Sequence, residues 1–226
     1  MKNFILFLIL TFSISSPLTV KTLLDQLQKY NEQINSISSK IGMIMSTPNG
    51  RIGQKGKFWF SFPGKTRIDF TTPVKQSTVF INNLTYYKGM NDVKYKEISD
   101  NKKDTSIDNL NDMYLFKFLK DKILVIETNK NEINILGYDD KDKTKKTFWG
   151  KYDPNLKLIN EFKIFQTKKG GLYSHVVQLY KSINGIPIAY KISAETSMGG
   201  YGGSIIIELK DIKLNINIPN SIWNIK

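Results

Sequence analysis

Short alternating apolar runs dominate the chain from residue 38 to residue 218. They are rich in Ile, Val, Phe, Tyr and Thr and are separated by turn residues such as Pro63-Gly64 and Asn184-Gly185, a pattern typical of strands joined by hairpins. Consecutive hairpins predict one antiparallel sheet, which must curl when it has many strands. The segments predicted as strands are 39–46, 53–62, 65–71, 75–81, 84–88, 93–98, 122–128, 131–138, 145–152, 156–166, 172–182, 187–196 and 203–218.

An amphipathic helix is predicted before the first strand. Its apolar residues recur at spacings of four and three, which places them on one helical face. Thr22 and Asp25 resemble a capping box at its start. We expect this face to pack on the sheet, and its apolar residues are Leu23, Leu27, Tyr30, Ile34 and Ile37.

A second, short helix is predicted at residues 110–119, after the polar stretch 99–109. Its apolar side chains surround most of the helix. Such a helix is either buried or covers an apolar opening.

The N-terminus has the pattern of a secretory signal peptide. Lys2 precedes the apolar run FILFLIL, which is too short to span a membrane, and small residues follow. We expect residues 1–16 to be removed, with cleavage near Ser15 or Ser16, and residues 17–226 to form a single domain. The chain has no cysteine, so it has neither disulfides nor a lipid-anchoring cysteine after the signal.

The formal net charge is +13. Such a charge favours anionic partners, including nucleic acid and anionic lipid surfaces. The lysines are scattered, however, and Lys, Asn and Ile are abundant everywhere, as a biased base composition would produce. We interpret the charge mainly as background with a secondary attraction to membranes.

Catalytic signatures are scarce. With no Cys and one His, Cys–His chemistry and the usual zinc sites are excluded. The acidic run 139–142 lacks the Gly and Glu of a calcium loop, and the glycine-rich segment 198–203 precedes a strand rather than a helix, so both predict hairpin tips. We therefore expect no enzyme activity, no catalytic residues, no metal site and no cofactor.

The stretch KFWFSFPGKTRIDF, residues 57–70, concentrates aromatic rings beside a turn. Alternation places Phe58, Phe60 and Phe62 on one strand face and Trp59 on the other. No basic residues share the face of the three phenylalanines, so the pattern favours apolar lining over nucleic-acid binding. Patterning alone leaves open whether this face is a solid core or a ligand cavity.

This stretch and its continuation resemble the LolA family of periplasmic carriers of outer-membrane lipoproteins. The resemblance rests on FWFSFPGKTRIDF, Thr72-Pro73, Gln76, the turn Asn82-Asn83 and the strand LTYY, and on Asn215, Ile218, Pro219 and Trp223 near the C-terminus. It is clearest over residues 53–98. Some members carry an Arg before the Pro that corresponds to Pro63, where this chain has Phe62.

The resemblance implies a mainly β fold with a few helices: an incomplete antiparallel β-barrel of about 11 strands, with an N-terminal helix and a helical lid around a hydrophobic cavity. The cavity would take lipoprotein acyl chains. Its expected lining is Phe58, Phe60, Phe62, Ile68 and Phe70; Leu115, Phe116 and Leu119 are expected on the lid, and Arg67 at the rim or at a transporter-docking surface.

The implied function is that of a periplasmic, monomeric chaperone that carries lipoproteins from the inner to the outer membrane. Its implied partners are acylated lipoproteins and an inner-membrane lipoprotein-releasing ABC transporter, with an outer-membrane acceptor as an optional further partner and no nucleic acid. Two alternatives share the fold: an envelope signal-binding regulatory protein and a carrier of free lipid or glycolipid.

Overall fold

The computed structural model describes residues 18–81, 84–98, 112–129, 132–165, 173–198 and 201–225. The predicted signal peptide, residues 1–16, lies outside these ranges, as does the polar stretch 99–109. Two α-helices, α1 (Val20–Glu32) and α2 (Asp112–Lys120), and one short 3₁₀ helix, η2 (Asn220–Trp223), accompany the sheet in the described part of the chain.

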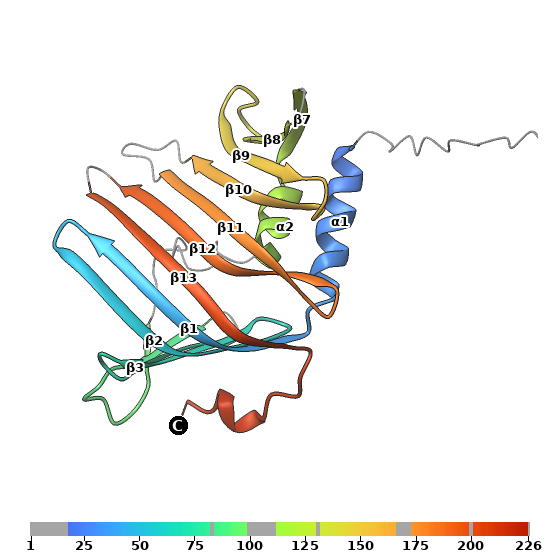
Figure 1. The fold of residues 1–226 in the computed structure, drawn as a ribbon. Helices are drawn as coiled ribbons and strands as arrows, with labels where there is room; N and C mark the ends of the chain where they lie inside the picture. The colour runs from blue at the N-terminus through green and yellow to red at the C-terminus, as the bar shows by residue number, and fades with distance from the viewer. Residues whose placement is uncertain are drawn as a thin grey trace, which may run out of the picture.

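The described residues form one antiparallel sheet (Figure 1), with strand order β6-β5-β4-β3-β2-β1-β13-β12-β11-β10-β9-β8-β7. Neighbouring strands in the sequence pair with each other, and the first and last strands, β1 and β13, pair at its centre. The strands are β1 (Ser36–Thr47), β2 (Gly50–Ser61), β3 (Lys65–Thr72), β4 (Gln76–Ile81), β5 (Leu84–Lys88), β6 (Lys96–Ile98), β7 (Ile123–Asn129), β8 (Glu132–Tyr138), β9 (Lys146–Asp153), β10 (Leu158–Phe165), β11 (Tyr173–Ile183), β12 (Ile186–Met198) and β13 (Tyr201–Leu214).

The predicted mainly β, incomplete barrel is confirmed. The sheet is open, because β6 and β7 stand at opposite ends of the strand order. The resemblance implied about 11 strands, and the described residues form 13, one for each segment predicted from the alternation of side chains. The Asn184-Gly185 turn joins β11 to β12 with φ of 53° and 81°, values that a tight hairpin turn requires.

The predicted N-terminal helix is confirmed as α1, but both of its ends lie earlier in the sequence than predicted. The side chain of Thr19, not Thr22, caps it, by accepting a hydrogen bond of 3.1 Å from the Thr22 backbone N–H. The helix ends at Glu32, so Ile34 is buried in the connection that follows and Ile37 belongs to β1. The apolar spacing continues past the end of the helix because Ile34 and Ile37 also turn toward the core.

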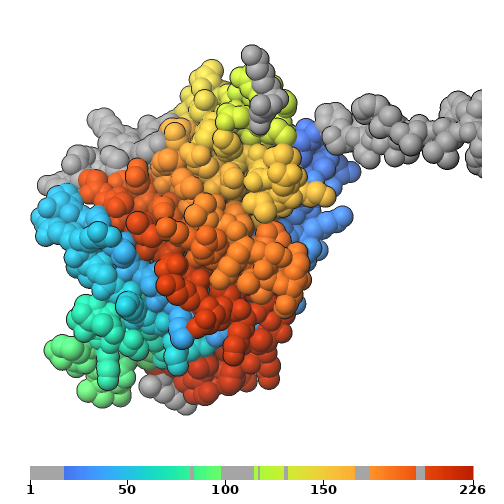
Figure 2. Space-filling view, viewed as in Figure 1, coloured from blue at the N-terminus to red at the C-terminus, as the bar shows by residue number. Residues whose placement is uncertain are grey.

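The core lies on one face of the sheet, which we call the inner face. Helices α1 and α2 pack on this face and against each other, and their buried side chains join those of the strands in one cluster. We call the opposite face the outer face. Strands β10–β13 turn their outer face to the viewer in Figure 2, with α1 at the right edge of the molecule.

The C-terminal segment closes onto the start of β1 and then onto the outer face. Asn215, with φ of 52°, accepts a hydrogen bond of 2.8 Å from the Asn35 backbone N–H and donates one of 2.9 Å to the carbonyl of Gln33. The chain then reaches η2, which contacts β3. Val79, Ile218 and Trp223 are buried but lie outside the main core cluster.

The pairing of β2 with β3 shifts by one residue between Lys55 and Gly56. A Cβ atom at Gly56 would lie 2.0 Å from the backbone oxygen of Asp69, so the two strands approach too closely for any side chain.

We expect Gly56→Ala to lower the free energy of unfolding by about 1–3 kcal/mol, because backbone atoms would have to move. The matched control is Gly53→Ala on the same strand, where a Cβ meets nothing within 4 Å and the expected change is below about 0.5 kcal/mol. Urea denaturation measures both. Equal stabilities of the two variants would contradict the close approach.

Candidate functional site

Four of the five predicted lining residues share the inner face. Phe58 on β2 lies opposite Ile68 on β3, and Phe70 lies opposite Gly56. Phe58, Phe60 and Phe70 are 8%, 2% and 6% exposed and belong to the core cluster, with Ile68 packed against it. At this end of the sheet the inner space is therefore filled by side chains.

Phe62, the fifth predicted lining residue, is separated from the other four. It follows the last residue of β2 at the Pro63-Gly64 turn and is 58% exposed. Its backbone N–H donates a hydrogen bond of 2.8 Å to the carbonyl of Asn35. Alternation along β2 would continue the inner face to Phe62, but the strand ends before it. Its position therefore gives no support for a lining role.

Helix α2 lies closed on the inner face. Leu115 and Leu119 are 4% and 0% exposed, and Phe116 packs against the core cluster. The ring centroid of Phe118 lies 5.9 Å from that of Phe148 on β9. The predicted short helix is confirmed, and the three residues expected on the lid are all packed on the core.

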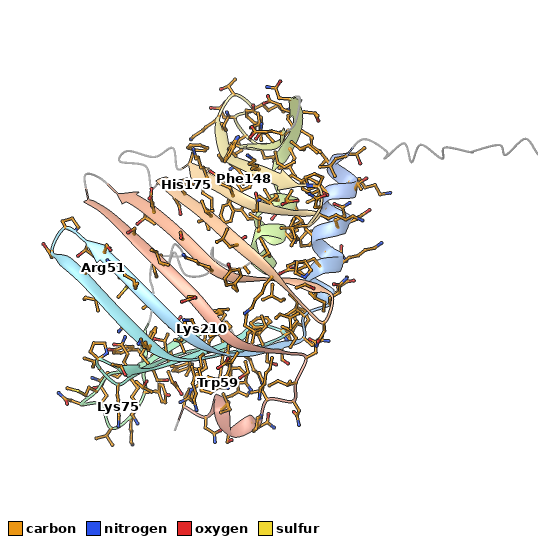
Figure 3. The ribbon with its side chains drawn as sticks, in the orientation of Figure 1. Arg51, Trp59, Lys75, Phe148, His175 and Lys210 are labelled. Carbon is orange, nitrogen blue, oxygen red and sulfur yellow. The ribbon has the colours of Figure 1, made fainter. Side chains whose placement is uncertain are left out.

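Phe148 links α2 to the sheet. It is fully buried, and its ring also stacks on Phe162 of β10 with a centroid separation of 6.1 Å. Figure 3 labels it at the level of the two helices. Gly137 and Gly150 make room for it: a Cβ at either position would lie 2.9 or 2.8 Å from Phe148 side-chain atoms.

A different part of the inner face remains partly exposed. Ile207 on β13 lies opposite Met43 on β1, and Ile205 lies opposite Met45. All four side chains are of intermediate exposure, and Ile52 on β2, opposite Met45, is 52% exposed. We call Met43, Met45, Ile205 and Ile207 the inner strip. It is an apolar surface next to the filled core.

The sequence contains the inner strip only as alternation within two predicted strands. The segments IGMIM and SIIIEL were predicted as strands without any residue being selected as lining. The pattern could indicate which residues share a face. It could not indicate which part of that face the helices leave uncovered.

Arg67 lies on the outer face, opposite Trp59. Its Nε donates to Asp69 Oδ1 at 2.8 Å, and its Nη1 donates to the carbonyl of Ile222 at 2.6 Å. The Arg67 side chain is 16% exposed. Its contacts therefore hold η2 against the sheet, and the guanidinium that was predicted at the rim or at a docking surface is engaged within the chain.

A polar network continues from Arg67 across β3 and β4. Ser77 donates a hydrogen bond to the same Asp69 oxygen, and the hydroxyl of Tyr95 donates to Ser77 Oγ at 2.7 Å. The guanidinium carbon of Arg67 lies 5.8 Å from the centre of the Tyr95 ring. The outer face at this point is thus a structural contact with the C-terminal segment, near which Figure 3 labels Trp59.

The other groups considered for chemistry lie at the surface. His175, labelled in Figure 3, has its Nε2 2.8 Å from Glu161 Oε1. The run 139–142 forms the exposed tip between β8 and β9, where the Lys141 backbone N–H donates to Asp139 and lowers the pKa of that carboxyl group. No group of three or more metal-ligating side chains occurs among the residues that the structure describes.

A groove of about 570 Å³ lies along α1, away from the inner strip. Its walls combine apolar side chains with charged and amide groups, among them Asp25 and Lys29 of α1. The residues that line it include Gln26, Lys29 and Tyr30 of α1, and Leu156, Lys157 and Pro187 from the strands and turns nearby.

Comparisons with known proteins identify the fold. No family model matches the sequence, and no curated protein sequence matches it. Solved structures do match. A DUF1329 family protein from Desulfovibrio piger is 12% identical, with a TM-score of 0.66 over 91% of this chain and 97% of that one.

Two further solved structures are similar. A LolA superfamily protein from Nitrosomonas europaea gives a TM-score of 0.64 at 12% identity, covering 92% of this chain and 98% of that one. A Vibrio parahaemolyticus domain described as that of an outer membrane lipoprotein-sorting protein gives 0.63 at 12% identity, covering 89% and 95%.

The open antiparallel sheet with helices on its inner face defines the class: a half-closed β-barrel whose interior is apolar. Its fold is similar to those of the LolA superfamily protein from Nitrosomonas europaea and the Vibrio parahaemolyticus domain, in agreement with the fold that the resemblance of residues 53–98 implied. Within the described ranges, no helix has the length and apolar character needed to cross a membrane.

Proposed function

We propose that this protein is a non-enzymatic periplasmic carrier that binds the acyl chains of lipoproteins. The inner strip is the observation that carries the proposal. It is an apolar, partly exposed surface on the inside of an open sheet, and the short helix α2 lies on the same face. The sorting role stated for the Vibrio domain of the same fold supports it.

The exposure of the strip suits a carrier that must release its cargo. Each CH₂ group buried contributes roughly 0.8 kcal/mol, so several fully enclosed acyl chains would dissociate too slowly. A surface that is only partly enclosed binds each chain less tightly. In this proposal α2 moves away from Phe148 when cargo enters, and the strip and the exposed underside of α2 share the chains.

Transfer in this proposal runs between two membranes. An inner-membrane lipoprotein-releasing ABC transporter loads the protein, and an outer-membrane acceptor or the membrane itself receives the cargo. The carrier acts as a monomer, since the inner face of one chain provides the binding surface.

Identification of the bound cargo tests the function. The protein is purified from the periplasm of its own host under mild conditions, and whatever remains bound is identified by mass spectrometry. We expect acylated lipoproteins. Recovery of free phospholipid or glycolipid alone would instead favour the carrier of free lipid, and an unacylated protein signal would favour the regulatory alternative.

A pair of variants tests the inner strip itself. Ile207→Gln places a polar amide on the strip, whereas Ile206→Gln alters the adjacent residue, of similar intermediate exposure, on the outer face. We expect the amount of cargo retained by the Ile207 variant to fall about tenfold or more, since the substitution replaces an apolar contact with a buried polar group. The Ile206 variant should bind as the natural protein does. Circular dichroism confirms that both are folded, and equal retention by both would argue against the strip.

A further inference from the structure

One polar side chain interrupts the apolar inner face of β2. Gln54 lies opposite Met43 of the inner strip. It faces the same side as Phe58 and Phe60, because the pairing of β1 with β2 runs without a shift from Ser36 to Thr47. Gln54 is only 7% exposed.

The Gln54 amide has an unmet hydrogen-bonding need. Its Oε1 is buried and has no hydrogen-bond partner among the residues that the structure describes. Leaving a buried acceptor unsatisfied costs about 1–3 kcal/mol, so such a group is retained against the stability of the fold. A buried acceptor on a binding face is satisfied when a ligand supplies the donor.

The location of Gln54 specifies which part of a ligand it would meet. Phe58, four residues away and about 13 Å along the strand, belongs to the filled core, and Ile52, about 7 Å in the other direction, is half exposed at the rim. Gln54 thus lies between the apolar interior and the solvent. An amphiphile whose chain follows the inner strip would place the junction between chain and head group there.

We propose that Gln54 accepts a hydrogen bond from the N–H of an amide that links an acyl chain to its carrier molecule, so that the inner face prefers amide-linked over ester-linked chains. This inference rests on the proposed function and specifies its substrate class. In the orientation that the structure gives the Gln54 amide, an ester linkage has only acceptors, which cannot satisfy Oε1, whereas a secondary amide presents one N–H at the junction.

A second unpartnered group on the same face provides the control. The hydroxyl oxygen of Ser39 also lacks a partner among the described residues, and Ser39 is 5% exposed. It lies opposite Phe58, inside the filled core and about 13 Å along the sheet from Gln54. A ligand that reaches Gln54 from the inner strip does not reach Ser39.

The test uses two probes that differ in one group, N-methylpalmitamide and methyl palmitate. Their chains are identical, but only the amide has an N–H. Affinities are measured with the full mature protein by competition against a fluorescent fatty acid. We expect the amide to bind about 3- to 10-fold more tightly, the range that one hydrogen bond provides.

Two variants assign that preference. Gln54→Met keeps a similar volume without the acceptor and should bind both probes equally. Its melting temperature should not fall, because an unsatisfied polar group has been removed. Ser39→Ala should keep the preference of the natural protein.

The outcomes separate this inference from the function on which it rests. Equal binding of the two probes by the natural protein, or a preference that survives in Gln54→Met, overturns the role of Gln54 and leaves the carrier function standing. Binding of neither probe overturns both. The first comparison uses the natural protein, so it holds even when a variant fails to fold.

Discussion

Replacing Phe148 by alanine is expected to lower the free energy of unfolding by about 3–5 kcal/mol, the cost of emptying a fully buried aromatic site. Phe148 is 0% exposed and stands between Phe118 of α2 and Phe162 of β10. Neighbouring side chains cannot easily fill the cavity left by the Phe148 ring, because two of its neighbours, Gly137 and Gly150, have no side chain. The loss should therefore lie near the upper end of the range.

The same variant should loosen α2, because Phe118 loses the ring it packs against. We expect faster tryptic cleavage at Lys120, which is exposed at the end of α2, while denaturant unfolding reports the global loss. The control is Trp149→Phe, on the neighbouring residue of the outer face, with an expected loss below about 1.5 kcal/mol. A loss below 1 kcal/mol for Phe148→Ala, about the value typical of an average substitution, would show that α2 does not depend on this contact.

The second large effect is expected for Arg67→Ala, with a loss of about 2–3 kcal/mol. The substitution leaves Asp69 without its cation and the Ile222 carbonyl without its donor, and hydrogen bonds to charged groups contribute about 1.5–3 kcal/mol. Asp69 keeps the hydrogen bond from Ser77, which limits the loss. The C-terminal segment should separate from the outer face.

Hydrogen exchange of the backbone amides of Ile222 and Asn224 measures that separation directly, since both donate within η2 and its end. Arg67→Lys keeps the charge but not the geometry and should fall between the natural protein and Arg67→Ala. Lys65→Ala is the control, because Lys65 lies on the same strand and its ammonium group contacts η2 through the Trp223 ring, at 6.0 Å, a weaker interaction than the hydrogen bonds of Arg67. If the Arg67→Ala variant keeps full stability but takes up less lipoprotein from inner membranes, Arg67 is a transporter-docking residue, as the sequence predicted.

The alternation of side chains predicted the sheet well because each strand is specified locally. In β2 the inward residues Phe58 and Phe60 and the outward Trp59 follow from period two alone. Hairpin turns such as Asn184-Gly185 fix the antiparallel order. The count of about 11 strands came from the family resemblance, and the chain's own pattern was the better guide.

The candidate site was harder to predict because it depends on contacts between distant segments. Arg67 and Ile222 are 155 residues apart, and no local pattern joins them. Phe62 follows the alternation of β2, but the strand ends one residue earlier. The burial of Phe60 and the exposure of Ile207 depend on where the helices pack, which the periodicity of either strand does not contain.

The position of β1 and β13 at the centre of the sheet has a mechanical consequence. The first and last strands pair in the middle of the sheet. The two edge strands, β6 and β7, are therefore consecutive in the sequence and are connected by residues 99–122, which include α2. Because β6 and β7 stand at opposite ends of the described sheet, bending of the sheet changes the distance between them while every ladder between neighbouring strands stays intact. Such bending changes the size of the inner space without breaking the hydrogen bonds between strands.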